Sequence, residues 1–290
     1  MADWIVLETE GARAEIVPRG AELRRWSVDG IELLWEPDPS VWPAVSPILF
    51  PLVGWARDGR IRVDGRSYEM GVHGFAAHED FDFVESGADF ARLSLRDNAE
   101  TRACYPFGFV LEATYRLAGR ALSVALDVRN TGDRDLPYAC GLHPGFRWPL
   151  TRAARQAHSI VFDRDESPDV PRIAPGGLFS SDTRPAPLQG RALPLFDSVF
   201  ADEALCFLDA NSDCVEYLDG SGARLRIGTS GFRHWAFWSR PPAPFVCIES
   251  WTGHGDPVGF NGYLTQKPSM ILLAPGATRR HEAVYAFSKA

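Results

Sequence analysis

The sequence predicts an all-β fold, a large antiparallel β-sandwich formed by one domain over residues 1–290. Three observations support this prediction. Apolar and polar residues alternate in many short segments, which is the period of a half-buried strand. Glycine, proline and aspartate close these segments, as turns between strands require. Helical periodicity is scarce and no internal repeat interrupts the pattern, so we expect about fifteen to twenty strands in two packed sheets.

The candidate strands follow one another along the chain. Segments 12–20 and 21–30 alternate and end in glycine. Segment 59–70, "GRIRVDGRSYEM", predicts two short strands around Asp64-Gly65, a dipeptide that favours a tight hairpin turn. Further segments with the same features are 109–132 (a long hairpin that turns at Gly119-Arg120), 214–230, 234–240, 245–251, 269–276 and 279–288.

The stretch 164–198 is the weak part of this pattern, because it is rich in Pro, Gly, Ser and Asp. Hairpins flank it on both sides, and the fold class does not change across it. We therefore expect a long connection over the surface rather than a linker between two domains.

Composition limits the classes of function. The chain is 45% hydrophobic, enough for a large core, and it carries a net charge of −8 with no run of lysine and arginine, so we expect no nucleic-acid partner. No stretch reaches about 18 consecutive apolar residues, so we expect no membrane span. The first residues, "MADWIVLETEG", lack the basic and apolar regions of a secretion signal.

The cysteines favour a reducing compartment. They are Cys104, Cys140, Cys206, Cys214 and Cys247. An odd number with no CxxC pair indicates neither a disulfide framework nor a zinc site. We therefore expect a cytoplasmic enzyme or binding protein.

Three glycine- and aromatic-rich segments concentrate residues that can carry chemistry. "GVHGFAAHEDF" contains His73, "CGLHPGFRWP" contains His143, and "FVCIESWTGHGD" contains Glu249. The prolines and glycines around His143 place it where a strand ends and the chain turns. An apolar strand delivers Glu249 near its end, among neighbours of the kind that raise a carboxyl pKa toward that of a useful base.

Each of these residues also has an ordinary structural explanation. A histidine beside glycine is often a turn or cap residue, and a glutamate at a strand end often only pairs with an arginine. His78 and Glu79 beside His73 suggest a metal site, but the segment lacks the helical HExxH pattern, so we expect no metal. The tryptophan patches, such as the one at Trp251, are either core aromatics or stacking faces for sugar rings.

Together these segments resemble the aldose 1-epimerase (galactose mutarotase) family, most closely its LacX-like branch. The resemblance lies in "SPILFPLVGWARDGRIRVDGRSYEMGVHGFAAHEDF", "LSLRDNAETRACYPFGFVLEATYRL", "VRNTGDRDLPYACGLHPGFRWPL", "PPAPFVCIESWTGHGDP" and "LLAPGATRRHEAVYAFS". It covers nearly the whole chain, in the family's order, and is weakest across 151–200. It implies the galactose mutarotase-like β-supersandwich. It also implies that Glu249 is the general base, that His143 is the general acid, and that His73 holds the substrate and helps to polarise the ring oxygen.

The resemblance implies further sugar contacts, and the chain departs from the family near them. An aspartate that holds sugar hydroxyls would fall near "FDSVFADEAL", where Asp197 and then Glu203 match best. The family often has arginine where this chain has Trp55 and Ala77. Residues i and i+2 of an extended strand share a face, so Arg57 could reach the pocket beside Trp55 and replace the missing arginine. Alternatively, the chain turns at "RDG" and Arg57 faces solvent.

The function that follows is interconversion of the α and β anomers of an aldohexose. Ring opening removes a proton from the anomeric hydroxyl and adds one to the ring oxygen, which a glutamate and a protonated histidine can do. We expect no cofactor and no metal, a small-molecule sugar as partner, and a monomer or homodimer. The alternatives are an epimerase of phosphorylated hexoses, a non-catalytic sugar-binding sensor of the same fold, and a metal-dependent isomerase of the cupin type.

Overall fold

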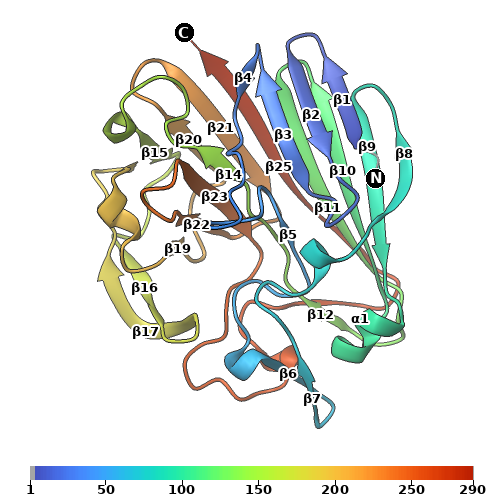
Figure 1. The fold of residues 1–290 in the computed structure, drawn as a ribbon. Helices are drawn as coiled ribbons and strands as arrows, with labels where there is room; N and C mark the ends of the chain where they lie inside the picture. The colour runs from blue at the N-terminus through green and yellow to red at the C-terminus, as the bar shows by residue number, and fades with distance from the viewer. Residues whose placement is uncertain (1–3, 290) are drawn as a thin grey trace.

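The fold is built almost entirely from antiparallel β-strands, which confirms the all-β prediction (Figure 1). The structure is a computed structural model that describes residues 4–289. The described part contains one α-helix, α1 (Ala99–Cys104). It begins after Asn98 because the Asn98 side chain accepts hydrogen bonds from the main-chain N–H groups of Glu100 and Thr101 in the first turn. The 3₁₀ turns are η1 (Arg57–Gly59), η2 (Ala76–His78), η3 (Arg155–Ala157), η4 (Asp197–Phe200) and η5 (Leu264–Gln266).

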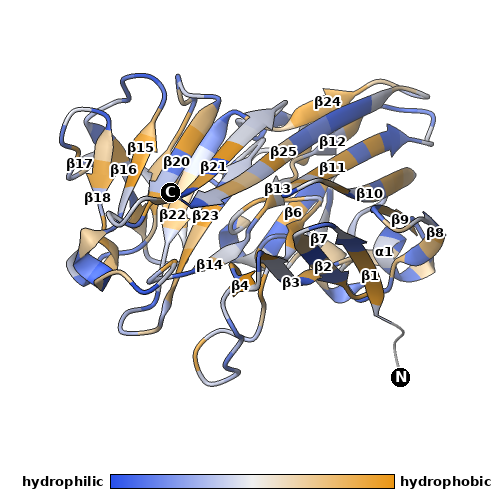
Figure 2. Ribbon diagram, turned by 90° about the horizontal axis from the view of Figure 1, so that it is seen from above, coloured by the Kyte–Doolittle hydropathy of each residue, from blue (hydrophilic) through white to orange (hydrophobic). Residues whose placement is uncertain are grey.

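The largest sheet has nine strands. Its order is β18 (Ala192–Pro194), β15 (Ser159–Phe162), β20 (Cys214–Leu218), β21 (Ala223–Ser230), β25 (Thr278–Lys289), β11 (Ala121–Asn130), β10 (Phe109–Ala118), β9 (Phe90–Arg96) and β8 (Asp82–Ser86). Strands β10 and β11 pair along their whole length and turn at Gly119-Arg120, so the long hairpin predicted from the sequence is confirmed. Figure 2 shows hydrophobic and hydrophilic residues alternating along these strands, as expected of a sheet with one buried face.

Two smaller sheets pack against the nine-stranded sheet. The first runs in the order β1 (Ile5–Thr9), β2 (Ala12–Ile16), β3 (Leu23–Val28) and β4 (Ile31–Glu32). It lies over β9–β11 (Figure 2). There the hydroxyl of Tyr115 donates to the carbonyl of Ala21. The second, six-stranded sheet contains β19 (Leu205–Phe207), β22 (His234–Trp238), β23 (Phe245–Trp251), β13 (Gly141–Leu142) and β5 (Ile48–Leu49), with β14 (Gly145–Arg147) also paired to β23. It packs on the other end of the large sheet, where Phe162 contacts Phe207 and Phe237.

Three two-stranded sheets complete the fold. They are β6 (Arg60–Val63) with β7 (Arg66–Glu69), β12 (Leu136–Tyr138) with β24 (Ile271–Leu273), and β16 (Asp169–Ala174) with β17 (Leu178–Pro185). The β6–β7 turn lies at Asp64 and Gly65, both at positive φ (49° and 75°), as predicted. The expectation of a long surface connection over 164–198 is wrong, because this segment forms the β16–β17 hairpin and β18. Many side chains of the hairpin are exposed, so its sequence shows little of the alternation that marks a half-buried strand.

Residues 4–289 contain twenty-five strands, more than expected, since several have only two or three residues. Buried side chains from both ends of the sandwich belong to one continuous hydrophobic cluster. The single-domain organisation over 1–290 stays a prediction. None of the helices in the described residues has the length and apolar character needed to span a membrane.

Candidate active site

Strand β23 is buried along its whole length and carries the candidate base. Successive side chains of a strand point to opposite faces, so Cys247, Glu249 and Trp251 share one face of the six-stranded sheet. The paired strand β22 places Ala236 directly opposite Glu249, and Trp238 opposite Cys247. This face of the sheet is the floor of the candidate site.

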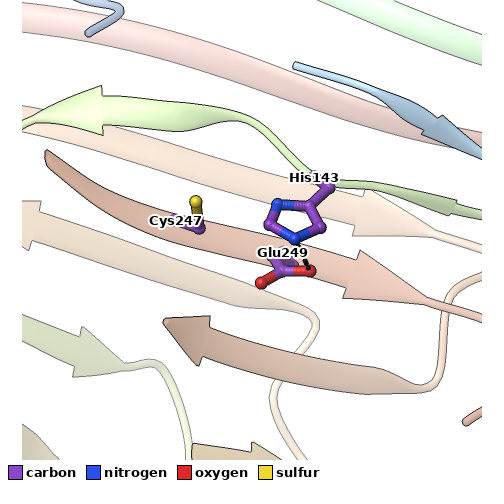
Figure 3. Close-up of side chains that lie close together, drawn as sticks. All are labelled: His143, Cys247 and Glu249. Carbon is purple, nitrogen blue, oxygen red and sulfur yellow. Dashed lines mark ion pairs between the residues drawn. The ribbon is translucent and has the colours of Figure 1, made fainter. Parts of the chain in front are cut away.

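His143 lies over this floor at the break between β13 and β14, so its predicted position at a strand end is confirmed. Both strands pair with β23, and His143-Pro144 separates them. The main-chain N–H of His143 donates to the carbonyl of Pro47 (3.2 Å), which holds the turn in place. As a result, Nε2 of His143 lies 3.2 Å from Oε2 of Glu249 (Figure 3). The two side chains are only 10% and 1% exposed.

His73 approaches the pair from the loop after β7. Its ring lies nearly perpendicular to that of His143, with 5.6 Å between the centroids. The main-chain N–H of Gly54 donates to Nδ1 of His73 (3.1 Å), so Nδ1 carries no proton and Nε2 carries the N–H. His73 itself has a φ of 63°, and its carbonyl accepts from the N–H of Phe50 (3.1 Å). The next residue must be glycine, because a Cβ on Gly74 would lie 2.2 Å from the carbonyl oxygen of Phe50.

Tryptophans surround the pair. The ring centroids of Trp42 and Trp238 lie 5.2 Å and 5.9 Å from that of His143. The indole N–H of Trp251 donates to Oε2 of Glu249 (3.0 Å). Trp251, which the sequence suggested as a stacking face for sugar, therefore contacts the candidate base itself.

Burial shifts all three candidate groups toward their neutral forms. Desolvation raises the pKa of Glu249 well above its ordinary value of 4.5, and the hydrogen bond from Trp251 opposes this only in part. Desolvation first, and the neighbouring His73 second, lower the pKa of His143 well below 6.5. Desolvation lowers the pKa of His73 to about 4. Burial therefore favours a neutral His73 and a His143–Glu249 pair that holds one proton.

The two acidic residues suggested as holders of sugar hydroxyls lie together in an open pocket. Asp197 begins η4, and Glu203 follows in the next loop; both line a pocket of about 580 Å³. Trp238 lines the same pocket and contacts His143 edge-on, so the pocket adjoins the aromatic surroundings of the buried pair. Asp197 also forms an ion pair with Arg155 at 3.0 Å.

The segment with Trp55 and Arg57 is not an extended strand, so the expectation that these side chains share one strand face is wrong. Arg57 begins the 3₁₀ turn η1 at the "RDG" sequence. Its main-chain N–H donates to Oδ2 of Asp256 (2.8 Å), and its half-exposed side chain donates to the carbonyl of Phe260 (3.3 Å). Trp55 packs on the turn between β16 and β17, where a Cβ on Gly177 would lie 1.9 Å from Cδ1 of the indole. A role for either residue in sugar binding stays a prediction.

Sequence reasoning missed three residues that the structure brings to the pair, namely Trp42, Trp238 and Cys247. Trp42 comes from the loop between β4 and β5, and no local pattern relates it to His143. Cys247 had a signal, because the alternation of "FVCIESW" places it on the same face as Glu249. The donor atoms of His143, Cys247 and Glu249 all lie within 4.8 Å of one another.

The chain is similar to known proteins along most of its length. A family model described as aldose 1-epimerase matches residues 3–286. The chain is 30% identical over 258 residues to "Protein LacX, chromosomal" of Lactococcus lactis subsp. lactis, which covers 85% of this chain and 86% of that protein.

Solved structures show the same fold. A galactose mutarotase related enzyme from Lactobacillus acidophilus has a TM-score of 0.92 and 25% identity, over 99% of this chain and 98% of that one. A galactose mutarotase-like protein from Lactobacillus casei ATCC 334 has a TM-score of 0.92 and 26% identity, over 99% and 100%. The fold and the family predicted from the sequence are thus confirmed, and the chain belongs to the aldose 1-epimerase family.

Proposed function

We propose that this chain is an aldose 1-epimerase that interconverts the α and β anomers of an aldohexose, with Glu249 as base and His143 as acid. Its family supports a sugar epimerase in general terms. The observation that carries the specific proposal is the 3.2 Å approach of a buried carboxyl to a buried imidazole. The anomeric hydroxyl and the ring oxygen of a sugar are bonded to the same carbon, so the groups that exchange protons with them must lie close together.

The single proton that His143 and Glu249 share is sufficient for the two proton transfers of ring opening. Glu249, as carboxylate, removes the proton of the anomeric hydroxyl while His143, as imidazolium, protonates the ring oxygen. The bond between the anomeric carbon and the ring oxygen breaks, an aldehyde forms, and the pair is left as neutral carboxyl and neutral imidazole. After rotation about the first carbon–carbon bond, the freed hydroxyl attacks the aldehyde and returns its proton to His143, and Glu249 protonates the aldehyde oxygen. The pair keeps one proton throughout, the state that burial favours.

His73 suits the role of a neutral hydrogen-bond donor to the sugar. Its Nδ1 accepts from Gly54, and its pKa of about 4 keeps the ring uncharged at neutral pH. The N–H on Nε2 then polarises a sugar oxygen without adding a second positive charge beside His143. Trp42 and Trp238 offer aromatic surfaces next to His143 on which the C–H edges of a sugar can pack.

The pocket beside the pair favours a neutral sugar over a phosphorylated one. Asp197 and Glu203 bring two carboxylates to its lining. Arg240 also lines it and Arg155 pairs with Asp197, so the pocket has no excess of positive charge for a phosphate. Carboxylates accept hydrogen bonds from sugar hydroxyls and repel phosphate. We therefore assign free hexoses as the substrate class and these two residues as holders of sugar hydroxyls.

Polarimetry of freshly dissolved α-D-glucose and α-D-galactose tests the proposal. The protein is expected to speed the approach to the equilibrium rotation without an added cofactor, also after treatment with EDTA, and to act more slowly on the corresponding 6-phosphates. Sugar binding in calorimetry without any acceleration would identify a sensor instead. Activity that EDTA abolishes and zinc restores would identify a metal-dependent isomerase.

A further inference from the structure

Three different metal-binding donors meet on the floor of the site. Cys247 and Glu249 are two residues apart on β23 and point to the same side, and His143 lies over them (Figure 3). The thiol sulfur, a carboxylate oxygen and a ring nitrogen lie within 4.8 Å of one another, and all three residues are buried. The free thiol of Cys247 has no part in the proposed proton transfer.

The spacing is close to that of a tetrahedral zinc site. Zn²⁺ binds thiolate sulfur at about 2.3 Å and imidazole nitrogen or carboxylate oxygen at about 2.0–2.2 Å. Two donors of such a tetrahedron lie about 3.4 Å apart. Nε2 of His143 and Oε2 of Glu249 already lie 3.2 Å apart. The sulfur of Cys247 lies within 4.8 Å of these two atoms, so side-chain movements that sum to roughly 1.5 Å or less would bring it to the same spacing.

We propose that His143, Cys247 and Glu249 form a binding site for a thiophilic divalent cation such as Zn²⁺, and that an ion bound there blocks the proton pair. The ion takes the place of the proton that His143 and Glu249 share. Three protein ligands leave a fourth position for water or a sugar oxygen. The ion is an inhibitor and not a cofactor, because the proposed reaction runs on the metal-free pair. The inhibition rests on the proposed function, whereas the binding does not.

The donor set predicts which ions bind. Thiolate and imidazole favour Zn²⁺ and Co²⁺, whereas Mg²⁺ and Ca²⁺ prefer sites made entirely of oxygen. Only Glu249 offers oxygen here. Mg²⁺ therefore serves as the negative control.

Binding is measured on the full chain without turnover, in a Cys104→Ser background that removes the only half-buried thiol of the five. Titration calorimetry is expected to show one equivalent of Zn²⁺, and Co²⁺ is expected to give thiolate-to-cobalt charge-transfer absorption. Cys247→Ala should abolish that absorption and weaken Zn²⁺ binding by about 100-fold or more, since even residues outside the ligand set change metal affinity roughly 10- to 100-fold. Cys247→Ser, which keeps the side-chain volume, is the second variant should the alanine protein fold poorly.

Cys206→Ala is the matched control. Cys206 is buried on β19, which is separated from β23 by strand β22. It pairs with Ala236 of β22, and Ala236 in turn pairs with Glu249. Its loss should leave both Zn²⁺ affinity and mutarotation unchanged.

Polarimetry in the presence of Zn²⁺ completes the test. We expect inhibition that EDTA reverses, and at least ten-fold higher Zn²⁺ to be needed in Cys247→Ala. Absence of Zn²⁺ binding, or binding that both Cys247 variants retain, would overturn the site. Binding through Cys247 without inhibition of an active enzyme would overturn the blocking role. Binding through Cys247 to a protein with no mutarotase activity would keep the site and overturn the proposed function.

Discussion

Two buried pairs of ionisable side chains in the described part of the chain are built in opposite ways. Nζ of Lys267 donates to Oδ1 of Asp256 at 2.7 Å, and the main-chain N–H of Arg57 donates to the other carboxylate oxygen at 2.8 Å. The carboxyl group of Glu249 faces an imidazole and receives one hydrogen bond, from the indole of Trp251. Both carboxyl groups are nearly excluded from solvent, at 6% and 1% exposure.

The Lys267–Asp256 pair is suited to a permanent ion pair, whereas the His143–Glu249 pair is suited to proton transfer. The ammonium of Lys267 and the main-chain N–H of Arg57 both donate to Asp256, so this pair fastens the loop after β23 to the segment at Arg57. The partner of Glu249 is a histidine, which can take up or release a proton, and burial favours the neutral forms of both. We therefore expect the first pair to control stability and the second to control turnover.

The largest expected effect is the loss of turnover in Glu249→Gln. The amide keeps the shape of the side chain but cannot accept the proton, so mutarotation should slow by roughly 10²–10⁴-fold. Polarimetry measures the rate, and circular dichroism should show an unchanged fold. Glu216→Gln, on β20, is the matched control and should keep the wild-type rate. Near-normal turnover in Glu249→Gln would refute the assignment of the base.

Lys267→Met should act on stability instead. It leaves the carboxylate of Asp256 buried without its cation, which costs about 3–5 kcal/mol of unfolding free energy. Urea unfolding measures this loss, and turnover per folded molecule should stay unchanged. Adding Asp256→Asn removes the stranded charge and should recover part of the stability. If Lys267→Met unfolds at the wild-type urea concentration, the pair does not fasten the loop.

The pH dependence of turnover sharpens the comparison. A second proton on the pair removes the base, and because burial lowers the pKa of His143 this occurs below pH 6.5. Loss of the shared proton removes the acid, and because burial raises the pKa of Glu249 this occurs well above pH 4.5. The rate profile should be bell-shaped with these limits.

Trp42→Ala tests the cause of the low acid limit. Removing the indole exposes His143 to water, which should raise the pKa of its imidazole. The midpoint of the acid side of the rate profile should then move up by roughly one pH unit, which corresponds to about 1.4 kcal/mol. A profile that does not move would show that Trp42 does not shield the imidazole.

Arg57→Ala should have the smallest effect. The main-chain N–H still reaches Asp256, and the half-exposed side chain loses only its contact with the carbonyl of Phe260 and an exposed ion pair with Asp58. We expect a change in unfolding free energy below about 1 kcal/mol and kcat/KM within about five-fold of wild type. A loss of ten-fold or more on any sugar would support the original prediction that Arg57 contacts the substrate.

Local signals predicted the parts of the fold that depend on neighbouring residues. The turn at Asp64-Gly65 was predictable because both residues tolerate positive φ. The break in the sheet at His143 was predictable from its prolines and glycines. The residue types of the site were equally visible, and their proximity was implied by the family resemblance, but the distance between them depends on which strands pair.

The features that the sequence did not predict all depend on long-range contacts. Most residues of the two strands of the β16–β17 hairpin are half-buried or exposed, so these strands carry little apolar alternation. Arg57 turns away from an extended path because its N–H is taken up by Asp256, a residue from the far end of the chain. Trp42 reaches His143 only because its loop folds back over the six-stranded sheet. Each of these depends on a partner that no local window of sequence contains.

His143 and Glu249 belong to neighbouring segments of one sheet, and their separation is set by the pairing of β13 and β14 with β23. Because β23 is buried along its whole length, we expect no local unfolding that separates His143 from Glu249 before the sheet unfolds. On heating, the acid and the base should stay together until the sheet itself opens. Thermal inactivation and global unfolding should then coincide in temperature.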